Sequence, residues 1–416
     1  MKNLKKYEEY EDYIKHQSSK TLDPVRRKKW LTEEWDLKVE GFNDVFSSIH
    51  EFVPRQGRVL CIGARTGQEV KSLRDLGFNA IGVDIVPHED LVIKGDMHNL
   101  PFEDEFFDFI FSNVFDHALY PEKKISEIER VLKTGGYAML HLQTGVVPDR
   151  FSENEIDNVD HDVIALFEQS KIMHSRPIVR NFAGMNWEVL MNKDDVLSSL
   201  YKSIGKISEI EVPSEYLQIW NDINLPIQQK KAKVHNLSRA QMEDCFSGLQ
   251  KRSYYLTLIA EFIGAKNIAE VGTAQGWQYY SFAKHMFKSG INGHIWSCDI
   301  IDARNKEYAN RYEKATTFVN GTSRDLANQI RKDKSKIDMF YIDGSHQAKA
   351  VLTDIKNLRD LQSENCVWIF DDFDTRFGCF REIQMLRNAN NRYKIYRVGN
   401  AASGNPNHQV IIFGKL

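Results

Sequence analysis

The sequence has few of the features that mark secreted, membrane or nucleic-acid-binding proteins. Its five cysteines, among 416 residues, stand far apart and form no CxxC pair, so we expect buried, reduced thiols and no zinc site. No apolar run approaches the ~20 residues that span a bilayer, and the charged start "MKNLKKYEEYEDYIKHQSSK" lacks the apolar core of a signal peptide. The formal net charge of −3 is unsuited to coating nucleic acid. We therefore expect a cytoplasmic globular protein with neither nucleic-acid nor membrane partners.

What the sequence does contain is an alternation of strand and helix patterns, and this alternation occurs twice. Apolar strand-like runs separated by helical patterns cover residues 57–143 and again 250–374. Such alternation is typical of crossover connections in a parallel sheet. Runs at 393–400 and 408–416 would add antiparallel edge strands. We predict an α/β protein with two Rossmann-like domains, each a mostly parallel seven-stranded sheet with helices on both faces.

The changes in composition along the chain suggest where its domains begin and end. Residues 1–50 are charged, helical and rich in aromatic side chains, which fit a packed core or a lid over the first site. A polar, Lys/Gln-rich stretch around 226–240 suggests a linker. We therefore expect three parts, namely a helical lid at 1–50, a first domain at 51–235 and a second at 236–416.

Each predicted domain has two glycines where its first strand turns into a helix. Gly63 and Gly67 follow "RVLCI", and Gly272 and Gly276 occupy the same places after "IAEV". Glycine permits positive φ and the close approach of a ligand to the backbone. The first turn of the following helix offers free N–H groups. The two loops therefore predict two nucleotide-type binding sites.

An acid ends the second strand of each domain, Asp84 in "AIGVD" and Asp299 in "IWSCD". A carboxylate there can accept hydrogen bonds from both hydroxyls of a ribose. Dinucleotide loops usually read GxGxxG, whereas here Arg65 and Ala274 replace the middle glycine. This spacing favours S-adenosylmethionine (SAM), which has no pyrophosphate to hold. A nicotinamide oxidoreductase is the disfavoured alternative.

The stretch "GDMHNLPFEDEFFDFIFSNVFDH…EIERVLKTGGYAMLHL" (95–142) resembles the small-molecule (type 11) branch of the class I SAM-dependent methyltransferases. This resemblance implies a set of SAM-contacting residues in the first domain: Gly63 and Gly67 in the loop, Asp84 at the ribose, Asp96 and Met97 at the adenine, and Asn113 at the methionine moiety. His117 follows the fourth strand, where substrate-facing residues lie in this fold, and is either a base or a packing residue. The family usually has an acid where Cys61 stands.

The second half, over about 250–416, resembles a different branch. "YIDGSH" and "FDDFD" are similar to motifs of metal-dependent O-methyltransferases, including macrocin O-methyltransferase and the cephalosporin-hydroxylase-like group. The resemblance implies a second set of site residues: Asp343, Asp371 and Asp372 as ligands of Mg²⁺, Asp343 and His346 as catalytic residues, and Glu270, Gly272, Gly276 and Asp299 at the second SAM. The bland alternatives are that "DGSH" only caps a helix and that His346 is a surface histidine.

Chemistry is consistent with that implied site. An alcohol attacks a sulfonium poorly while it is protonated. Carboxylates suit Mg²⁺, a bound metal lowers the pKa of a hydroxyl, and an imidazole can take the proton near neutral pH. Adjacent strands lie roughly 4.8 Å apart, so we expect the aspartates that end them to converge on one ion.

We therefore interpret the chain as a bifunctional SAM-dependent O-methyltransferase that acts on hydroxyls of a sugar, a glycan or another small molecule. It would bind up to two SAM molecules, and Mg²⁺ in its C-terminal domain. In one alternative only one domain, with the C-terminal one as the better candidate because of Cys61, is catalytic, and the other binds SAM or docks. In another the chain is a non-catalytic scaffold in a biosynthetic complex. The sequence leaves open the acceptor, the regiochemistry, the pathway and whether the chain forms a homo-oligomer.

Overall fold

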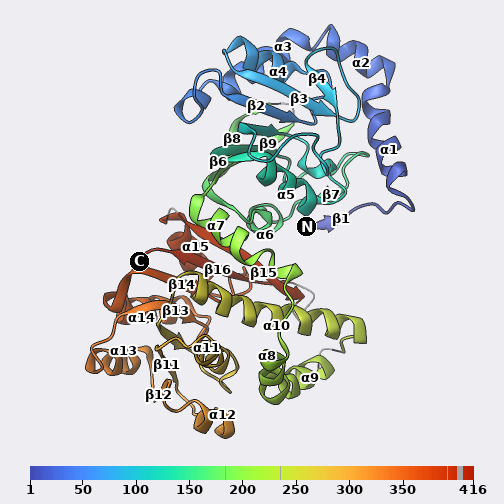
Figure 1. Ribbon diagram of the computed structural model, residues 1–416. Helices are drawn as coiled ribbons and strands as arrows, with labels where there is room; N and C mark the ends of the chain where they lie inside the picture. The colour runs from blue at the N-terminus through green and yellow to red at the C-terminus, as the bar shows by residue number, and fades with distance from the viewer. Residues whose placement is uncertain (183, 235, 391, 401–405) are drawn as a thin grey trace. The chain divides into compact units, whose positions relative to one another are not determined.

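The computed structural model describes residues 1–182, 184–234, 236–390, 392–400 and 406–416. The chain divides into two compact units, Met1–Ser199 and Leu200–Leu416, which run from blue to green and from green to red in Figure 1. The sequence placed the boundary near residue 235, whereas the compact units divide after Ser199. Residues 200–235 belong to the second unit because α8 (Ser214–Ile219) and the π-helix η5 (Trp220–Asn224) pack against helix α11 (Trp277–Lys288).

The first unit contains one seven-stranded sheet with the strand order β4-β3-β2-β5-β6-β9-β8. Its strands are β2 Arg58–Ile62, β3 Asn79–Asp84, β4 Val92–Lys94, β5 Phe107–Ser112, β6 Leu132–Leu142, β8 Ser170–Phe182 and β9 Met185–Lys193. Its α-helices are α1 Tyr10–Leu22, α2 Pro24–Leu31, α3 Trp35–Phe46, α4 Gln68–Asp75, α5 Pro121–Val131, α6 Val159–Asp162 and α7 Asp195–Ile204, the last of which crosses the boundary. Short elements complete it: β1 Lys2–Asn3, β7 Asn154–Glu155, η1 Ile49–Glu51, η2 Phe115–His117 and η3 Ile164–Leu166. Strand β9 runs antiparallel to both of its neighbours.

The second unit repeats this architecture, with the strand order β12-β11-β10-β13-β14-β16-β15. Its strands are β10 Asn267–Val271, β11 His294–Asp299, β12 Thr316–Asn320, β13 Ile337–Ile342, β14 Gln362–Phe370, β15 Tyr393–Asn400 and β16 Pro406–Phe413. Besides α8, η5 and α11, its helices are η4 Ile207–Glu209, α9 Leu225–Val234, α10 Arg239–Phe262, α12 Lys306–Arg311, α13 Ser323–Lys332, α14 Ala348–Leu358, η6 Arg359–Leu361 and α15 Phe380–Asn388. Strand β16 is the antiparallel one, so the predicted pair of α/β domains is confirmed.

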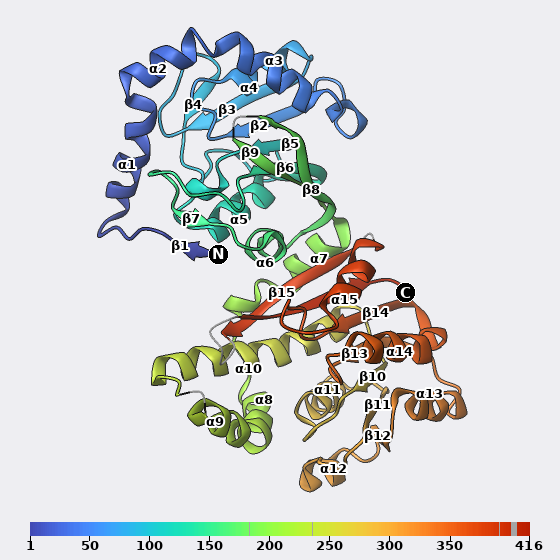
Figure 2. The same cartoon turned by 180° about the vertical axis from the view of Figure 1, so that it is seen from behind.

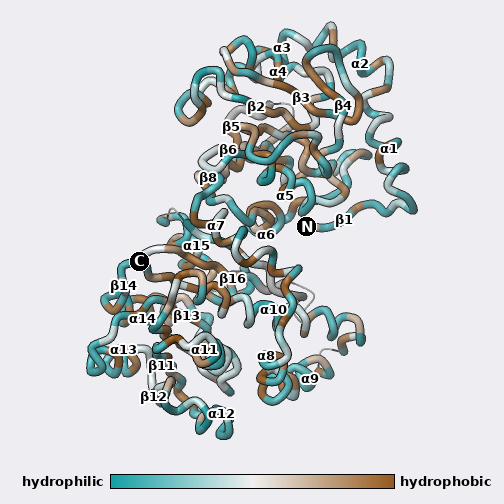
Figure 3. The backbone as a smooth tube through the Cα atoms, in the orientation of Figure 1, coloured by the Kyte–Doolittle hydropathy of each residue, from teal (hydrophilic) through white to brown (hydrophobic). Residues whose placement is uncertain are grey.

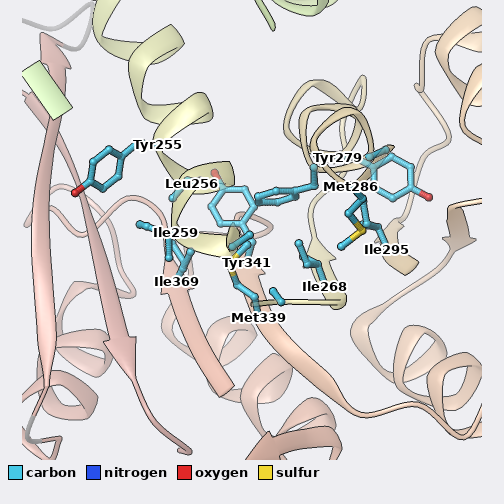
Figure 4. Close-up of a cluster of buried hydrophobic side chains, with 14 of the residues drawn as sticks. Tyr255, Leu256, Ile259, Ile268, Tyr279, Met286, Ile295, Met339, Tyr341 and Ile369 are labelled. Atoms are coloured by element: carbon cyan, nitrogen blue, oxygen red, sulfur yellow. The ribbon is translucent and has the colours of Figure 1, made fainter. Parts of the chain in front are cut away.

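The strands form where the sequence has continuous apolar runs. The last four residues of β2 and of β10 are all buried, because helices leave neither face of a parallel sheet in water. In the first unit α3 and α4 pack together beside the sheet, and Figure 3 shows the hydrophobic colour along its strands. In the second unit α10 contributes Tyr255, Leu256 and Ile259 to the core (Figure 4). The strand ends of each sheet therefore directly follow residues that are packed in a hydrophobic core.

The N-terminal segment is helical, as predicted. Asp23 ends α1 and caps α2, because its carboxylate accepts the backbone N–H of Arg26 and Pro24 occupies the first helical turn. Figure 2 shows α1 and α2 as successive helices along the outside of the first unit. Among the residues described, we find no helix with the length and apolar character needed to cross a membrane.

Candidate active sites

The two glycine loops have the same backbone conformation. Six of their residues have positive φ: Gly63 (78°), Arg65 (48°) and Gly67 (84°) in the first unit, and Gly272 (96°), Ala274 (46°) and Gly276 (90°) in the second. A Cβ atom at Gly272 would lie 2.2 Å from the carbonyl oxygen of Asp343, so only glycine fits there. Each loop leads into a helix, α4 or α11, whose N-cap is the last glycine. Free N–H groups therefore face the loop in both units.

The acid at the end of the second strand fixes each loop. Oδ2 of Asp84 accepts the backbone N–H of Arg65 at 3.1 Å, and Oδ2 of Asp299 accepts that of Ala274 at 2.9 Å. Burial raises the pKa of Asp84, while its backbone hydrogen bonds act in the opposite direction. The sequence predicted both acids as ribose ligands, but it did not reveal that they also hold the loops. The shared GxxxG loop before a strand-end acid was the signal for this second role.

A cavity in the first unit brings several predicted residues together. Its lining includes Gly63, Asp84, Asp96, Met97 and His117. Helix α1 contributes Tyr13, Gln17, Lys20 and Thr21 to the same lining. Gly67 and Asn113, the other predicted cofactor residues of this unit, are not part of the lining described. The residues predicted at the adenine and at the ribose thus line the same cavity as the candidate base His117.

Helix α1 is tied across this cavity by hydrogen bonds. The hydroxyl of Tyr10 donates to Oδ2 of Asp96 at 2.6 Å, and that of Tyr13 donates to the carbonyl of His117 at 3.0 Å. Burial is the main reason that the pKa values of both tyrosines lie above their usual range. Tyr13 therefore lines the cavity, and Tyr10 ties α1 to the lining residue Asp96. Both belong to the aromatic N-terminal segment for which the sequence predicted a core or a lid.

The imidazole of His117 is held in one tautomer. Its Nδ1 lies 2.8 Å from the carbonyl oxygen of Phe151, which can only accept, so Nδ1 carries the proton. Its Nε2 lies 3.2 Å from Nζ of Lys20 and therefore acts as an acceptor. The pKa of His117 is lowered to about 4, mainly by burial. The charge of Lys20 acts in the same direction, and Asp116 opposes the shift. The imidazole is therefore neutral, and its Nε2 lone pair accepts a hydrogen bond from Lys20.

The second unit keeps the strand acid that the first unit lacks. Glu270 is buried in β10, and its Oε2 accepts the hydroxyl of Ser297 at 2.6 Å. Burial raises the pKa of Glu270 to about 8 although Ser297 favours the charged form. Cys61 occupies the matching position in β2 and is fully buried. The two units thus differ at a residue that the resemblance assigns to the amino-acid end of SAM.

Two of the three aspartates predicted as magnesium ligands lie in one buried polar cluster. Tyr341 donates its hydroxyl to Oδ2 of Asp343 at 3.0 Å and to Oδ2 of Asp371 at 3.2 Å. Oδ2 of Asp371 also accepts Nη1 of Arg252 at 2.6 Å, and its Oδ1 accepts Nε2 of Gln409 at 3.1 Å. Burial and the charge of Asp371 raise the pKa of Asp343 well above its usual value. Both oxygens of Asp371 are therefore already engaged by protein groups.

The third aspartate points to the candidate base. Oδ2 of Asp372 lies 2.6 Å from Nδ1 of His346, whose ring also packs 4.9 Å from that of Phe377. This hydrogen bond is the main reason that the pKa of His346 is raised. The pairing assigns the proton to Nδ1 and leaves Nε2 free to accept another. This carboxylate–imidazole pair is consistent with the interpretation of "DGSH" as a catalytic motif.

The three aspartates have the right chemistry for the predicted magnesium site, because carboxylate oxygens are the preferred ligands of Mg²⁺. Their arrangement does not suit the ion. Asp343, Asp371 and Asp372, all of them described residues, do not bring three ligand oxygens within 4.8 Å of one another. The residues as they stand therefore do not form the expected ion site, because Arg252 and His346 have taken two of its carboxylates.

Sequence reasoning missed Arg252, which lies on a buried helical stripe, and Lys20, which lies beside one. Arg252 occurs in α10 with Leu256 and Ile259, at spacings of four and three residues, and all three are buried. Such spacing marks the core-facing side of a helix, so a charged residue there predicts a buried partner. In α1 the buried residues Tyr13, Gln17 and Thr21 also recur at helical spacing and mark the side of the helix that faces the core. Lys20 lies next to this side.

Comparisons with known proteins agree with this architecture. Two family models, each described as a methyltransferase domain, match residues 60–140 and 269–373. An uncharacterised methyltransferase of Staphylococcus carnosus is 30% identical over 204 residues, which are 44% of this chain and 97% of the relative. An uncharacterised protein of Methanocaldococcus jannaschii is 26% identical over 199 residues, covering 44% of this chain and 90% of the relative. A solved O-methyltransferase of Bacillus cereus, in complex with SAH, has 17% identity and a TM-score of 0.35, covering 52% of this chain and 99% of its own.

The sheets, the loops and the matching models define a protein with two SAM-type α/β domains. The chain belongs to the SAM-dependent methyltransferases.

Proposed function

We propose that the chain is an O-methyltransferase with two SAM sites, one in each unit. The observation that carries this proposal is the repeated loop, in which a residue with positive φ donates its N–H to the strand-end acid. A loop with free N–H groups and a carboxylate at ribose position is the cradle that a nucleoside cofactor needs. Bound SAM would supply a methyl group on a sulfonium centre.

In the second unit the proposed base is His346. Nε2 of His346 would take the proton of the acceptor hydroxyl, whose oxygen would receive the methyl group that bound SAM supplies, with the sulfur leaving as a neutral thioether. Asp372, 2.6 Å from Nδ1, stabilises the imidazolium that results. The remaining rate enhancement comes from alignment of the reacting atoms. No step is assigned to magnesium, because the predicted ligands do not fit it.

In the first unit the proposed base is His117. Its neutral imidazole lines the same cavity as Asp84 and Asp96, and the carbonyl of Phe151 fixes its tautomer. Lys20 lies beside Nε2 and also pairs with Asp149 at 2.9 Å. Lys20 would have to release Nε2 before His117 takes a proton from the acceptor.

A second candidate is a protein in which only the C-terminal unit is catalytic. Cys61 favours this alternative, because the first unit then lacks the strand acid that Glu270 supplies in the second. The first unit would bind SAM weakly or serve as a docking module. A non-catalytic scaffold is a weaker alternative, because both strand-end acids keep their loop contacts.

For the acceptor we propose a hydroxylated small molecule, with a sugar or glycan as the first choice. We place this activity in the cytoplasm, and the five cysteines, all free and buried, agree with a reducing compartment. The test is mass spectrometry of products formed from SAM and a panel of nucleotide-sugars and glycans. A product heavier by one or two methyl groups on oxygen supports the proposal. SAM that binds to neither unit would reject it.

A further inference from the structure

A buried arginine pairs with one of the three aspartates that the sequence predicted as ligands of a divalent ion. The side chains of Arg252 and Asp371 are 8% and 7% exposed, and Nη1 and Oδ2 are 2.6 Å apart. The guanidinium also lies 5.6 Å from the ring centroid of Trp277, the first residue after the loop glycine Gly276. The cation therefore stands between the cofactor loop and the strand-end carboxylates.

Protein groups contact both carboxylate oxygens of Asp371. Oδ2 accepts from Arg252 and Tyr341, and Oδ1 accepts from Gln409. Tyr341 links the pair to Asp343 through a second bond of its hydroxyl. A guanidinium is permanently charged. An incoming Mg²⁺ would have to displace it from a buried ion pair and then remain beside a like charge.

We propose that Arg252 is the resident cation of the C-terminal site and that this site works without a divalent metal. Arg252 is a positioning residue: it fixes Asp371 and, through Tyr341, Asp343, while Asp372 remains free to orient His346. This inference rests on the proposed function for its catalytic part only. The cation's place can be tested without any methyl transfer.

The first experiment uses the full wild-type chain and Mn²⁺ as a paramagnetic probe for Mg²⁺. Electron paramagnetic resonance should detect no stoichiometric Mn²⁺ that depends on Asp343 and Asp372, and EDTA should change the transfer rate by less than about twofold. One bound equivalent that is lost in Asp343→Asn and Asp372→Asn would overturn the inference. Mn²⁺ that survives both substitutions lies elsewhere and supports it. Because Mn²⁺ binding is read without acceptor or SAM, failure of the proposed function would not be confused with failure of this inference.

The second experiment removes the arginine and compares two variants. Arg252→Ala empties the cation's place and leaves Asp371 unpaired, so it should gain a Mn²⁺ equivalent and melt at a higher temperature when Mn²⁺ is added. Arg252→Lys keeps a positive charge and should gain neither. Circular dichroism identifies a variant that does not fold, and the wild-type titration decides in that case. A folded Arg252→Ala that binds no Mn²⁺ would show that the arginine is not what excludes the ion.

Discussion

Glu270 and Cys61 occupy the same place in the two sheets, the last residue but one of a strand in the middle of each sheet. A buried carboxylate costs free energy when it is charged, and the pKa of Glu270, raised to about 8 by burial, expresses that cost. At this scale the two units are therefore unequal, and our proposal gives the acid of the second unit a role beside the amine of SAM.

The buried acid should make stability depend on pH. Between its usual pKa of 4.5 and its folded value of about 8, Glu270 binds more protons in the folded than in the unfolded state. The free energy of unfolding should therefore fall as pH rises through this range, by about 1.4 kcal/mol per unit of pKa difference at most. Thermal melts of wild type and Glu270→Gln at pH 5 to 9 should diverge in favour of the variant as pH rises.

The exposed residue Glu261 in the same unit provides the control. Glu261→Gln makes the same chemical change where the side chain remains in water, and it should track wild type across the pH range. Parallel curves for Glu270→Gln and wild type would contradict the assignment of a buried, neutral carboxyl group.

The base of the second unit gives a second prediction. His346→Ala should lower kcat for the C-terminal reaction by roughly 10²–10⁴, with partial recovery at high pH because more of the acceptor is then ionised. Single-turnover transfer from labelled SAM measures the effect. His50→Ala, which removes an exposed imidazole in the first unit, is the matched control. An unchanged rate in His346→Ala would assign the proton transfer to another group.

At the scale of elements, the strands and loops follow from the sequence more directly than the contacts between distant elements do. The apolar run of "IDMFYI" predicts β13 and the position of Asp343 after it, because a strand buried on both faces leaves a clear pattern. The partner of Asp371 is 119 residues away in α10. No local pattern states which residue a helix will place beside a given strand end. The magnesium site was expected from the residues of the motif. The motif does not include Arg252, the distant residue that pairs with Asp371.

The charge that α10 places beside the strand ends, on Arg252, can be weighed by its electrostatic interaction with a second cation. Two unit charges about 4 Å apart interact by roughly 4 kcal/mol at an effective dielectric constant near 20. This repulsion opposes a doubly charged ion beside the guanidinium of Arg252, whereas ionised aspartates attract one. If Arg252 excludes the ion, the position of α10 selects between an arginine site and a metal site on the same strand ends.

Helix α1 gives a prediction of its own. Tyr10→Phe removes the hydrogen bond to Asp96 and should release SAM from the first unit faster, by about 10- to 150-fold at most, since one bond to a charged group contributes about 1.5–3 kcal/mol. Stopped-flow dissociation measures the rate. Tyr120→Phe alters a ring that stacks on Tyr10 at 6.1 Å but keeps the Asp96 bond, and it should behave as wild type. Equal rates in all three proteins would mean that α1 does not retain the cofactor.

At the scale of the whole molecule, two sheets with the same strand order lead us to expect two cofactor equivalents. Calorimetry of the wild-type chain should give a SAM stoichiometry near two. Asp84→Ala should weaken one of the two binding events by about 10- to 100-fold, and Asp299→Ala the other, because each loses the carboxylate that fixes its loop. Asp302→Ala, which removes a more exposed acid near Asp299, should leave both events intact. Loss of both events through one substitution would show that the units do not bind independently.

The repeated loop geometry has a practical consequence for any laboratory that studies this chain. The same hydrogen bond, from a residue with positive φ to a strand-end acid, occurs in both units of one polypeptide. The effect of a substitution in one unit can therefore be compared with the unchanged loop of the other unit. Expression level, buffer and temperature are then shared by sample and standard, so small differences between the copies become measurable.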